Sequence, residues 1–574
     1  MQQFVVDPSR MLRVKESHDD AAHILLQMFA RYGVRAAFGI PGGLISPVFR
    51  ALADVPQIEL VCPRHESMGV FCAMGHYIAT GVPALVLTTS GPGATNIVTG
   101  LAAALSEEIP VIAVAGEVAT GSTSRAAFQD ATTSAIDVVA MMRTISRWSM
   151  RVESAAGAAG AAENAFRAAV GPRPGPVFLS LPVDVAASHT QRTNFACTPA
   201  SLTTSVNIEA CRKIARSLAR AQRPLFIVGN GARGAAGELL RVARKLAVPV
   251  ITTAHAKGIF PESDPLSLGV IGWGGHASAA AYLASGPDVV CVVGSRLGEI
   301  ATNGWTMPIA GSDSTFQIDR NPQFIGRNYP VTMAVIADAK PALVAIAEAM
   351  SFDVVRPEAP AKPALQVAPI NHHAGARVVH PKDLFARLQL AFPDASWAVD
   401  IGEHGVLATH YLKIDHPNRF RTMLGLGSMG SGIGVAIGWK QADRSRQVIC
   451  VCGDGGFMMH AGEILSCVEH GIGVIFVVAN DGRWNMVNRG FDSVYGFAPP
   501  SLPSRIADIA GVASNLGAVG VLVESKKDLE RFKLEALATL GRPVVLDVRI
   551  DPEIAMSDQS RARALTDAAF GGGR

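Results

Sequence analysis

Two acidic residues, each placed where an apolar run ends, are the strongest candidates for chemistry in this sequence. Asp454 lies in Gly453-Asp454-Gly455, directly after the run 448–452, and Asp481 follows the apolar segment 473–479 and one asparagine. Both runs read as buried strands joined by a single crossover, so the two carboxylates should emerge side by side. The glycines let backbone amides approach a diphosphate at the start of the next helix. Two carboxylates and a diphosphate supply the oxygen ligands that Mg²⁺ prefers.

The predicted cation site needs one further protein ligand, which we expect to be a backbone carbonyl near Arg483. A Gly-Asp-Gly turn also follows strands by chance in α/β proteins. The turn alone therefore leaves two interpretations open, a diphosphate and metal site or an ordinary tight turn.

A second candidate lies far upstream, at Arg64-His65-Glu66. The apolar segment 58–62 predicts a strand and a helix should begin next, which puts Glu66 in the first helical turn. The apolar residues that follow on this helix are Met68, Val70, Phe71 and Met74. A carboxyl in apolar surroundings holds its proton more strongly, as a proton-transfer catalyst requires. A glutamate at a helix start can equally serve only to offset the helix dipole.

Two glycine-rich segments accompany these candidates, Gly39-Ile40-Pro41-Gly42-Gly43 and the run 89–96, which reads Thr-Ser-Gly-Pro-Gly-Ala-Thr-Asn. Together with Glu66 and the turn at Asp454 they resemble the thiamine diphosphate (ThDP)-dependent decarboxylase and carboligase superfamily, and most closely its acetolactate synthase branch. The resemblance extends from about residue 15 to residue 551. It implies ThDP and Mg²⁺ as cofactors, and a homodimer or homotetramer with active sites at the subunit interface.

The resemblance also implies individual roles around the cofactor. Glu66 would hydrogen-bond the aminopyrimidine ring and favour its imino form, so that the exocyclic nitrogen can remove the proton at thiazolium C2. Met429 matches the apolar wedge that folds the cofactor, although a core methionine in a glycine-rich turn is the alternative. Glu403 stands where the family has glutamine, which puts a negative charge near the diphosphate. The other implied cofactor-binding residues are His404, Gly427, Gly453, Gly455, Gly456 and Met486, and the implied metal residues are Asp454, Asp481 and Arg483.

Substrate contacts are implied at Gly42, on the loop that would face the thiazolium, and at Phe128-Gln129. By resemblance the substrates are a 2-oxo acid, most simply pyruvate, and a carbonyl acceptor. The tryptophan that helps acetolactate synthases to choose their second 2-oxo acid falls on Gly490, so the acceptor stays unidentified. Trp273 and Trp305 could fill part of that pocket or could belong to the core.

Three classes of function stay open. The first is a carboligase that decarboxylates a 2-oxo acid and transfers the resulting acyl-anion unit to the acceptor. The second is a simple 2-oxo acid decarboxylase or a flavin-linked 2-oxo acid oxidase. The third is a non-catalytic paralogue that keeps the fold, and the retention of Glu66, Met429 and Asp454 argues against it.

The middle of the chain carries Gly229-Asn230-Gly231-Ala232-Arg233-Gly234 between a predicted strand and a predicted helix, which satisfies G-x-G-x-x-G. The acidic residue expected about twenty positions later is missing, which argues against NAD. By resemblance, Gly294-Ser295-Arg296 and Ile318-Asp319 flank FAD in flavin-bearing relatives. The Phe-Asp-Asp-Arg run of acetolactate synthases reads Leu297-Gly298-Glu299-Ile300 here, so FAD, another nucleotide and no ligand all stay open.

Strand and helix signals alternate along three blocks, at 14–187, 207–350 and 378–551. Such alternation predicts parallel sheets with helices on both faces. The predicted fold class is therefore α/β, with three doubly wound parallel-sheet domains. By resemblance these are a pyrimidine-binding, a central nucleotide-binding-like and a diphosphate-binding domain. A polar link at 188–206 and a linker rich in Pro, Ala and Lys at 357–375 separate the blocks.

Composition argues against several other classes. The 574 residues include 51 basic and 48 acidic side chains, a net charge of +3 that leaves no nucleic-acid footprint and no polybasic membrane patch. Glycine, proline and polar residues interrupt each apolar run before it reaches bilayer length, and residues 1–14 have no secretory apolar core. The eight cysteines are scattered without metal-ligand spacing, as is usual in a reducing compartment, so we expect a cytoplasmic enzyme.

Overall fold

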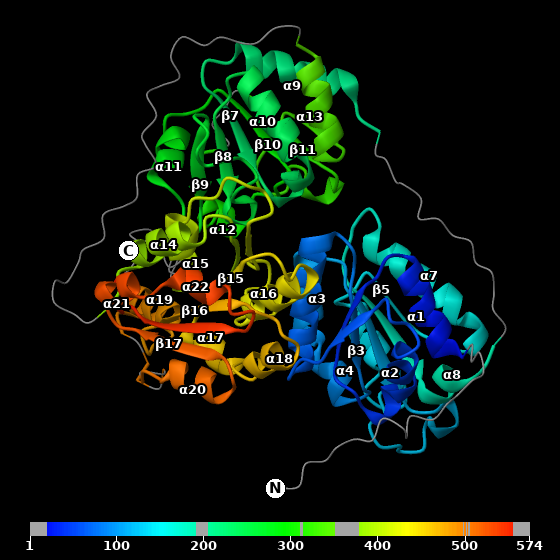
Figure 1. Ribbon diagram of the computed structural model, residues 1–574. Helices are drawn as coiled ribbons and strands as arrows, with labels where there is room; N and C mark the ends of the chain where they lie inside the picture. The colour runs from blue at the N-terminus through cyan, green and yellow to red at the C-terminus, as the bar shows by residue number, and fades with distance from the viewer. Residues whose placement is uncertain are drawn as a thin grey trace.

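The computed structural model describes residues 20–190, 205–309, 314–350, 378–497, 499–500, 502 and 505–554. Within them the chain forms three six-stranded sheets, each built from parallel strand pairs and flanked by helices (Figure 1). The predicted fold class, α/β with three doubly wound parallel-sheet domains, is confirmed. The strands of each sheet fall inside one predicted block, whereas the block boundaries themselves stay predictions. The predicted linker at 357–375 lies outside the described residues.

The N-terminal sheet has the strand order β2-β1-β3-β4-β6-β5. Its strands are β1 (Ala36–Gly39), β2 (Glu59–Val61), β3 (Leu85–Thr88), β4 (Ile112–Glu117), β5 (Trp148–Arg151) and β6 (Val177–Pro182). Phe38 faces the core that contains α3 (Glu66–Thr80), and Ala37 faces the core that contains α1 (Ala21–Arg31), because successive strand residues point to opposite faces. The strand order reverses at β1 and β3, so the loops after these two strands border the crevice where such sheets bind ligands.

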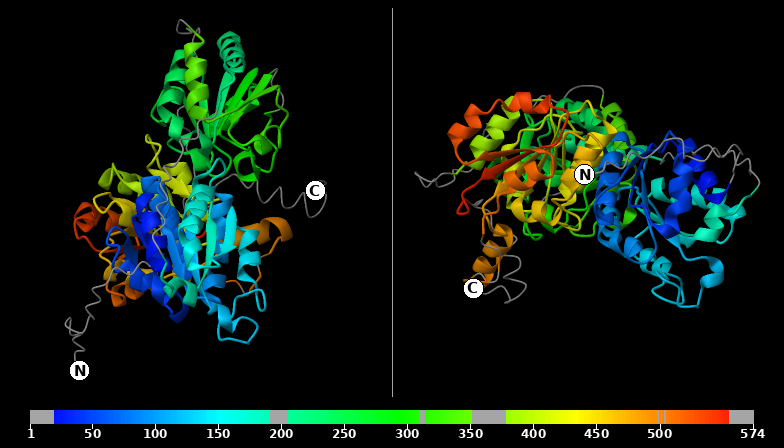
Figure 2. Two further views of the ribbon diagram at one scale, coloured as in Figure 1. Left: turned by 90° about the vertical axis from the view of Figure 1, so that its right-hand side faces the viewer. Right: turned by 60° about the horizontal axis from the view of Figure 1, so that its bottom comes forward.

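The central sheet has the order β12-β11-β10-β7-β8-β9 and lies above the other two domains in Figure 1 and in the left view of Figure 2. Its strands are β7 (Pro224–Val228), β8 (Val250–Thr253), β9 (Ser267–Ile271), β10 (Val289–Val293), β11 (Ser314–Asp319) and β12 (Met333–Ile336). The helices α9 (Ile208–Arg220), α10 (Ala236–Lys245) and α13 (Ala339–Glu348) share one core, and α11 (Ala277–Ala284) packs in the other. Here the order reverses at β7 and β10, whose following turns carry Gly229 and Gly294.

The C-terminal sheet repeats this topology in the order β14-β13-β15-β16-β18-β17. Its strands are β13 (Ser396–Val399), β14 (Phe420–Thr422), β15 (Val448–Gly453), β16 (Ile475–Asn480), β17 (Val519–Val523) and β18 (Val544–Arg549). One face packs with α14 (Pro381–Ala391) and α15 (Glu403–Tyr411), and the other with α16 (Ser431–Ala442), α18 (Glu463–Glu469) and α20 (Ile509–Asn515). The switch point lies between β13 and β15, next to the predicted diphosphate turn.

The N-terminal and C-terminal domains share one hydrophobic core, where α3 packs against α16 (Figure 1). Glycines permit the close approach of the two helices. A Cβ on Gly438 would lie 1.8 Å from the carbonyl oxygen of Cys72, and a Cβ on Gly75 would lie 2.1 Å from that of Val435. Both obstacles are backbone atoms, which cannot move aside cheaply. The crossing therefore fixes the helix that carries Glu66 against the C-terminal domain of the same chain.

Two further expectations concern the whole chain. Among the described residues, no helix combines the length and the apolar character needed to cross a bilayer. The seven cysteines in that part of the chain are free thiols, and all but Cys62 are buried. They therefore behave as small hydrophobic residues of the cores, as expected.

Candidate active site

A cavity of about 650 Å³ opens at the carboxyl edge of the C-terminal sheet, beside β13, β15 and β16. All of the predicted cofactor-binding and metal residues line it: Glu403, His404, Gly427, Met429, Gly453, Asp454, Gly455, Gly456, Asp481, Arg483 and Met486. Trp273, Gly274 and Gly275 of the central domain contribute to its wall as well. The fold thus brings residues that are widely separated in sequence to the wall of one cavity.

The two aspartates at this edge are held by backbone amides. The α17 helix (Asp454–Met459) begins at Asp454, whose carboxylate accepts hydrogen bonds from the N–H of Gly455 at 2.7 Å and of Gly482 at 2.9 Å. Asp481 accepts from the N–H of Arg483 at 3.0 Å. Burial, and next the negative charge of Asp481, raise the pKa of Asp454 to about 7. Burial also raises the pKa of Asp481. A cation between these carboxylates would relieve their mutual repulsion.

The donor set fits a small hard cation better than a zinc-type site. Among the described residues, no group of three or more His, Cys, Asp or Glu side chains is placed to hold a metal ion. The guanidinium of Arg483 forms an ion pair with Glu553 at 3.1 Å and cannot be a ligand, so only the backbone carbonyl near Arg483 could act as one. Two carboxylates completed by a carbonyl and phosphate oxygens match the preference of Mg²⁺.

His404 is the clearest sign that a polar ligand belongs in the cavity. It is the second residue of α15 and is buried, with a glycine at 453 whose Cβ would lie 3.0 Å from the ring Nδ1. Its Nε2 is buried without a hydrogen-bond partner among the described residues. Burial lowers the pKa of His404 to about 4, so the ring is neutral. A buried polar atom without a partner in a cavity wall is expected to meet a ligand or water.

Glu403 does not leave an uncompensated charge beside the diphosphate position. It forms an ion pair with Arg489 of α19 (Asn485–Tyr495) at 3.0 Å. Burial raises the pKa of Glu403 to about 7, Arg489 opposes this shift, and Asp481 adds to it. Arg489 is not predictable from the sequence, because a lone arginine in a polar helix gives no signal of the glutamate that it pairs with.

The turn that carries Met429 is fixed by a residue that the sequence analysis did not select, Asp400. This fully buried carboxylate follows β13 and accepts hydrogen bonds from the N–H of Gly430 at 2.8 Å and of Gly432 at 3.0 Å. Its burial raises its pKa to about 6. Gly430 has φ +84°, which disfavours any other residue. A Cβ on Gly455 would lie 3.2 Å from the Met429 Cε, so the methionine projects over the Gly-Asp-Gly turn, as a wedge requires.

The predicted catalytic residues Gly42, Glu66, Phe128 and Gln129 form a second group at the carboxyl edge of the N-terminal sheet. A Cβ on Gly42 would lie 2.7 Å from the Thr89 Cβ, so the loops after β1 and β3 touch. The backbone oxygen of Gln129 accepts a hydrogen bond from Ser90 at 2.8 Å. In the described part of the chain, none of the four residues lines the C-terminal cavity. The structure therefore does not bring the two groups together within one chain.

Glu66 begins α3 as expected, with His65 as the N-cap. The expected apolar surroundings are not supplied by its own helix, because Met68, Val70, Phe71 and Met74 are buried in the core whereas Glu66 is half-buried. Its carboxylate accepts a hydrogen bond from Asn96 at 2.9 Å. The expectation failed on this point because the first position of a helix lies at its end, outside the buried stripe.

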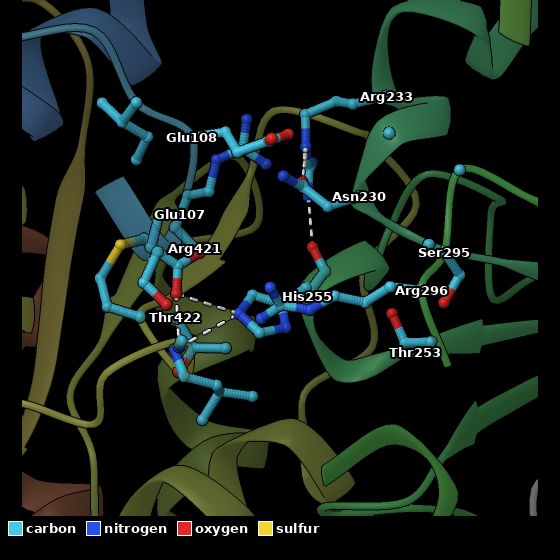
Figure 3. A pocket seen from close by; sticks show the side chains of 18 of the residues that line it. Glu107, Glu108, Asn230, Arg233, Thr253, His255, Ser295, Arg296, Arg421 and Thr422 are labelled. Carbon is cyan, nitrogen blue, oxygen red and sulfur yellow. Dashed lines mark hydrogen bonds and ion pairs between the residues drawn. The ribbon is translucent and has the colours of Figure 1, made fainter. Parts of the chain in front are cut away.

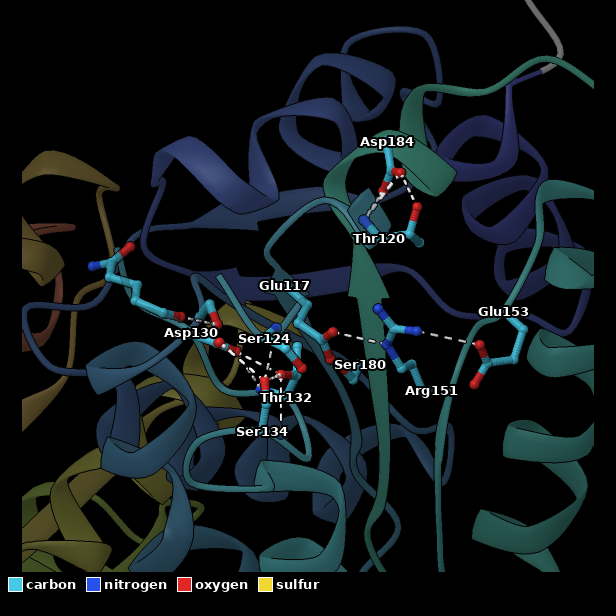
Figure 4. A network of polar contacts seen from close by, with 12 residues as sticks. Glu117, Thr120, Ser124, Asp130, Thr132, Ser134, Arg151, Glu153, Ser180 and Asp184 are labelled. Atoms are coloured by element: carbon cyan, nitrogen blue, oxygen red, sulfur yellow. Dashed lines mark hydrogen bonds and ion pairs between the residues drawn. The ribbon is translucent and has the colours of Figure 1, made fainter. Parts of the chain in front are cut away.

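Phe128 and Gln129 lie on a strained loop between β4 and α6 (Val138–Arg143). Ser124, Ala126, Gln129 and Asp137 all have positive φ, which is costly for residues with a side chain. Polar contacts hold the loop, and Figure 4 shows Asp130 accepting from the N–H of Thr132 at 2.9 Å and from its hydroxyl at 2.7 Å. Phe128 is 87% exposed. The loop therefore presents the Phe128 side chain outward, away from the core.

Family models match three segments of the chain, and together these cover more than half of it. They are described as the N-terminal TPP binding domain (residues 19–141), the central domain (211–346) and the C-terminal TPP binding domain (400–548) of thiamine pyrophosphate enzymes. Thiamine pyrophosphate is another name for ThDP. The chain belongs to the thiamine pyrophosphate enzyme family.

This ThDP-dependent enzyme is similar over most of its length to acetolactate synthases. Acetolactate synthase of Arthrospira platensis is 30% identical over 92% of this chain and 94% of its own length. The acetolactate synthase large subunit IlvB1 of Mycobacterium tuberculosis (strain CDC 1551 / Oshkosh) is 30% identical over 92% and 87%, respectively. Acetolactate synthase isozyme 3 large subunit of Escherichia coli is 29% identical over 92% and 94%.

The enzyme has a second, larger cavity of about 1030 Å³, where the central domain meets the other two (Figure 3). The glycine turn after β7, the turn Gly294-Ser295-Arg296 and the pair Ile318-Asp319 all line it, as the resemblance implies for a nucleotide site. Four arginines also line it: Arg233, Arg296, Arg320 and Arg421. The Nη1 atom of Arg233 is buried without a hydrogen-bond partner in the described structure. These donors suit a ligand with phosphate groups.

The resemblance connects three residues with the acceptor pocket, Trp273, Gly490 and Trp305, and they differ in location. Trp273 lines both cavities, and Gly490 lines the C-terminal one, with no atom within 4 Å of the Cβ it would carry. Trp305 is 52% exposed and lines neither cavity, so it is not a core residue, and its place in an acceptor pocket stays a prediction. It follows a short helix, α12 (Glu299–Thr302), and a positive-φ turn, and so projects away from the core.

Proposed function

We propose that the protein is a ThDP- and Mg²⁺-dependent carboligase that decarboxylates a 2-oxo acid, pyruvate in the simplest case, and transfers the acyl-anion unit to a carbonyl acceptor. The observation that carries this proposal is the C-terminal cavity, which is lined by two half-buried carboxylates, by His404 with its unpaired Nε2, and by Met429, all residues that sequence reasoning assigned to the cofactor. Similarity to acetolactate synthases over more than nine-tenths of the chain supports the same reaction class.

The residues of this cavity fit the two cofactors. Asp454, Asp481 and a backbone carbonyl near Arg483 would hold Mg²⁺, while His404 and the amides of the Gly453–Gly456 turn would hold the diphosphate. Gly427 and Met429 would contact the organic part, with Met429 as the wedge. When bound, ThDP would supply a nucleophilic carbon, thiazolium C2, for the carbonyl of the 2-oxo acid. Glu66 would hold the proton at the pyrimidine nitrogen that faces it.

The reaction balances without an oxidant. In pyruvate the C1–C2 bond breaks and releases CO₂, and C2 then forms a bond to the carbonyl carbon of the acceptor, whose oxygen takes up a proton. Gly42, Phe128 and Gln129 would contact the reacting groups. A second copy of the chain would bring this N-terminal group to the C-terminal cavity, so we propose a homodimer, or a homotetramer of such dimers, with the active site at the subunit interface.

Purified protein incubated with ThDP, Mg²⁺, ¹³C-labelled pyruvate and a panel of aldehydes and 2-oxo acids tests the function, with products identified by mass spectrometry. Release of CO₂ together with a new C–C bond is the expected result. CO₂ with free acetaldehyde would instead assign a decarboxylase, and a stoichiometric electron acceptor requirement would assign an oxidase. Glu66→Gln serves as the matched control, and CO₂ release no faster than in that variant would make the chain non-catalytic.

For the central cavity we propose a phosphate-bearing nucleotide, with FAD as one form that it could take. The four arginines and the buried Arg233 donor support a nucleotide without distinguishing its base. Protein denatured after gentle purification should release the ligand for chromatography and absorption spectroscopy. A flavin spectrum would identify FAD, an adenine spectrum alone would identify another nucleotide, and Arg296→Ala should reduce the amount retained. A cytoplasmic location and the absence of membrane and nucleic-acid partners stay predictions from the sequence.

A further inference from the structure

The start of α3, which presents Glu66, is held by the C-terminal domain of the same chain. The Oε1 atom of Glu463, the first residue of α18, accepts a hydrogen bond from the backbone N–H of Arg64 at 2.9 Å and from that of His65 at 3.1 Å. These two residues directly precede Glu66, and His65 is the N-cap of α3. One carboxylate oxygen from another domain therefore fixes the backbone where the helix begins.

The Glu463 side chain is buried and accepts hydrogen bonds through both carboxylate oxygens, unlike an incidental surface contact. Its side chain is only 2% exposed, and its second oxygen accepts a hydrogen bond from the Ser466 hydroxyl at 3.1 Å. Burial raises its pKa to about 7, an effect that the backbone hydrogen bond from Arg64 opposes. Burying a carboxyl is costly unless it is hydrogen-bonded, and all three of its hydrogen bonds serve this one turn and its own helix. Glu463 lines neither cavity, so it touches no proposed ligand.

Further contacts with the C-terminal domain hold the segment 59–64, which leads into α3. The N–H of Cys62 donates to His470 Nε2 at 3.0 Å, and the Arg64 side chain forms an ion pair with Glu469. Earlier in the segment, Glu59 accepts a hydrogen bond from Gln441 at 2.9 Å. These outer contacts are partly exposed and contribute little individually. Glu463 is the buried contact, and it is the one adjacent to Glu66.

We propose that Glu463 is a positioning residue for Glu66. By accepting both backbone N–H groups it determines where α3 begins, and so where the Glu66 carboxyl lies relative to the pyrimidine ring it would contact. The inference rests on the proposed function, in which Glu66 handles the proton of the cofactor. Misplacing a reacting group by about 1 Å can slow a reaction by roughly a hundredfold, so a contact that touches no ligand can still set the rate.

Three variants of the full-length protein separate position from charge. Glu463→Ala removes the acceptor, whereas Glu463→Gln keeps an oxygen for both N–H groups but loses the charge. Glu469→Ala is the matched control, because it removes only the exposed ion pair to the Arg64 side chain. Two rates are measured: amide hydrogen exchange in the peptide 62–68 without cofactor, and exchange of the C2 proton of bound ThDP in the presence of Mg²⁺. ThDP affinity and melting temperature are recorded for each variant.

Glu463→Ala should speed amide exchange at Arg64 and His65 and slow C2-proton exchange by roughly tenfold or more, with ThDP affinity changed by less than about threefold. Glu463→Gln and Glu469→Ala should stay close to wild type in both rates. Wild-type C2-proton exchange in Glu463→Ala, or equal slowing in the Gln and Ala variants, would overturn the proposal. If Glu463→Ala does not fold, Glu463→Asp withdraws the acceptor by one methylene and should give an intermediate slowing, whereas an unchanged rate would overturn it.

Glu66→Gln, measured alongside, separates this inference from the proposed function. If Glu66→Gln leaves C2-proton exchange at the wild-type rate, the role proposed for Glu66 fails. If Glu66→Gln slows exchange and Glu463→Ala does not, only the positioning role fails.

Discussion

The two halves of the candidate active site differ in how far one chain completes them. The C-terminal half lines a cavity, where its two aspartates are half-buried and the buried Nε2 of His404 has no partner among the described residues. The N-terminal half is open, with Glu66 half-buried and Phe128 87% exposed on a loop with several positive-φ residues. The residues of the first half face one cavity, whereas Phe128 of the second half faces outward. This difference is expected if the halves of one chain serve two different active sites of a dimer.

The comparison also separates binding from proton transfer. In the proposed function, the C-terminal half binds the cation and the diphosphate, and Glu66 of the N-terminal half is the acid-base group. Damage to the first half should therefore abolish cofactor binding, while damage to the second should leave binding in place and slow the chemistry.

Loss of Asp454 should have the largest effect on cofactor binding. Asp454→Ala removes one of two carboxylates facing the cation, and the charge of the diphosphate is compensated mainly by that cation. We expect metal-dependent ThDP affinity to fall by roughly a hundredfold or more, since second-sphere changes at metal sites alone cost about 10–100-fold. Isothermal titration of ThDP with and without Mg²⁺ measures this. Undiminished binding in the variant would place the cation elsewhere.

Glu66→Gln tests the N-terminal half of the candidate active site. The substitution keeps size and hydrogen bonding but removes the acid-base function, so ThDP affinity should change little while C2-proton exchange slows by roughly 10²–10⁴-fold. Rapid-quench NMR of the exchanging C2 proton provides the rate. Asn96→Ala, which removes the hydrogen-bond donor to Glu66 and no acid-base group, is the control and should cause a much smaller loss.

Mixing two variant proteins, each defective in a different half of the site, tests whether the N-terminal half of one chain meets the C-terminal half of another. Glu66→Ala and Asp454→Ala proteins are each inactive in this view, but a heterodimer contains one site with both lesions and one intact site. With random exchange of subunits, activity should return to roughly a quarter of wild type. Subunit exchange is verified by mass spectrometry of differently labelled chains. If exchange is complete and no activity returns, each site must be built within a single chain.

The sequence predicted the C-terminal half well because its residues sit at the ends of buried strands. Central strands of a parallel sheet read as continuous apolar runs, so the turns after β15 and β16 could be located, and every predicted residue there lines one cavity. The edge strands β5, β12 and β17 are only partly buried and were not predicted: β5 has no apolar run, and the short apolar runs of β12 and β17 do not by themselves distinguish a strand from a helix.

The contacts missed by the sequence analysis all join residues that are distant along the chain. Asp400 shapes the Met429 turn through amides thirty positions later, and Glu463 holds the turn before Glu66 from another domain. Neither residue type signals its partner, because a backbone N–H is present at almost every position. The half-exposed state of Glu66 was missed for a similar reason: apolar neighbours in sequence were taken as neighbours in space.

The pH dependence of cofactor binding should reflect the C-terminal half alone. A cation needs Asp454 ionised, and the pKa of Asp454 is raised to about 7 in the cation-free fold, so protons compete with Mg²⁺ below that pH. Affinity for Mg²⁺ with ThDP should be about tenfold weaker near pH 6 than near pH 8. The raised pKa also means that Asp454 contributes stability to the cation-free protein below the ordinary aspartate pKa, which is lost as pH rises through about 7.

Thermal melts with and without Mg²⁺ and ThDP, taken between about pH 6 and pH 8, test the direction of this pH dependence. The increase in melting temperature caused by the cofactors should grow with pH. In melts without cofactors, Asp481→Asn removes the neighbouring negative charge and should move the pH-dependent change in stability to lower pH, because that charge is one cause of the raised pKa of Asp454. A cofactor effect that is constant over this range would mean that Asp454 does not exchange a proton for the cation.

The smallest effect should come from Gly490, on the open side of the cavity. No atom lies within 4 Å of the Cβ that this residue of α19 would gain, so Gly490→Ala should fit without displacing anything. Removing a glycine from a helix stabilises it by up to about 1 kcal/mol, and ThDP affinity should stay within about twofold of wild type. Gly237→Ala in α10, where the space is equally open, is the control for this effect away from the cavity.

Gly490→Trp should then leave decarboxylation of pyruvate intact while excluding larger acceptors, which product analysis with acceptors of increasing size would detect. If the tryptophan changes no acceptor preference, Gly490 does not face the acceptor, and the open wall of the C-terminal half has no part in specificity.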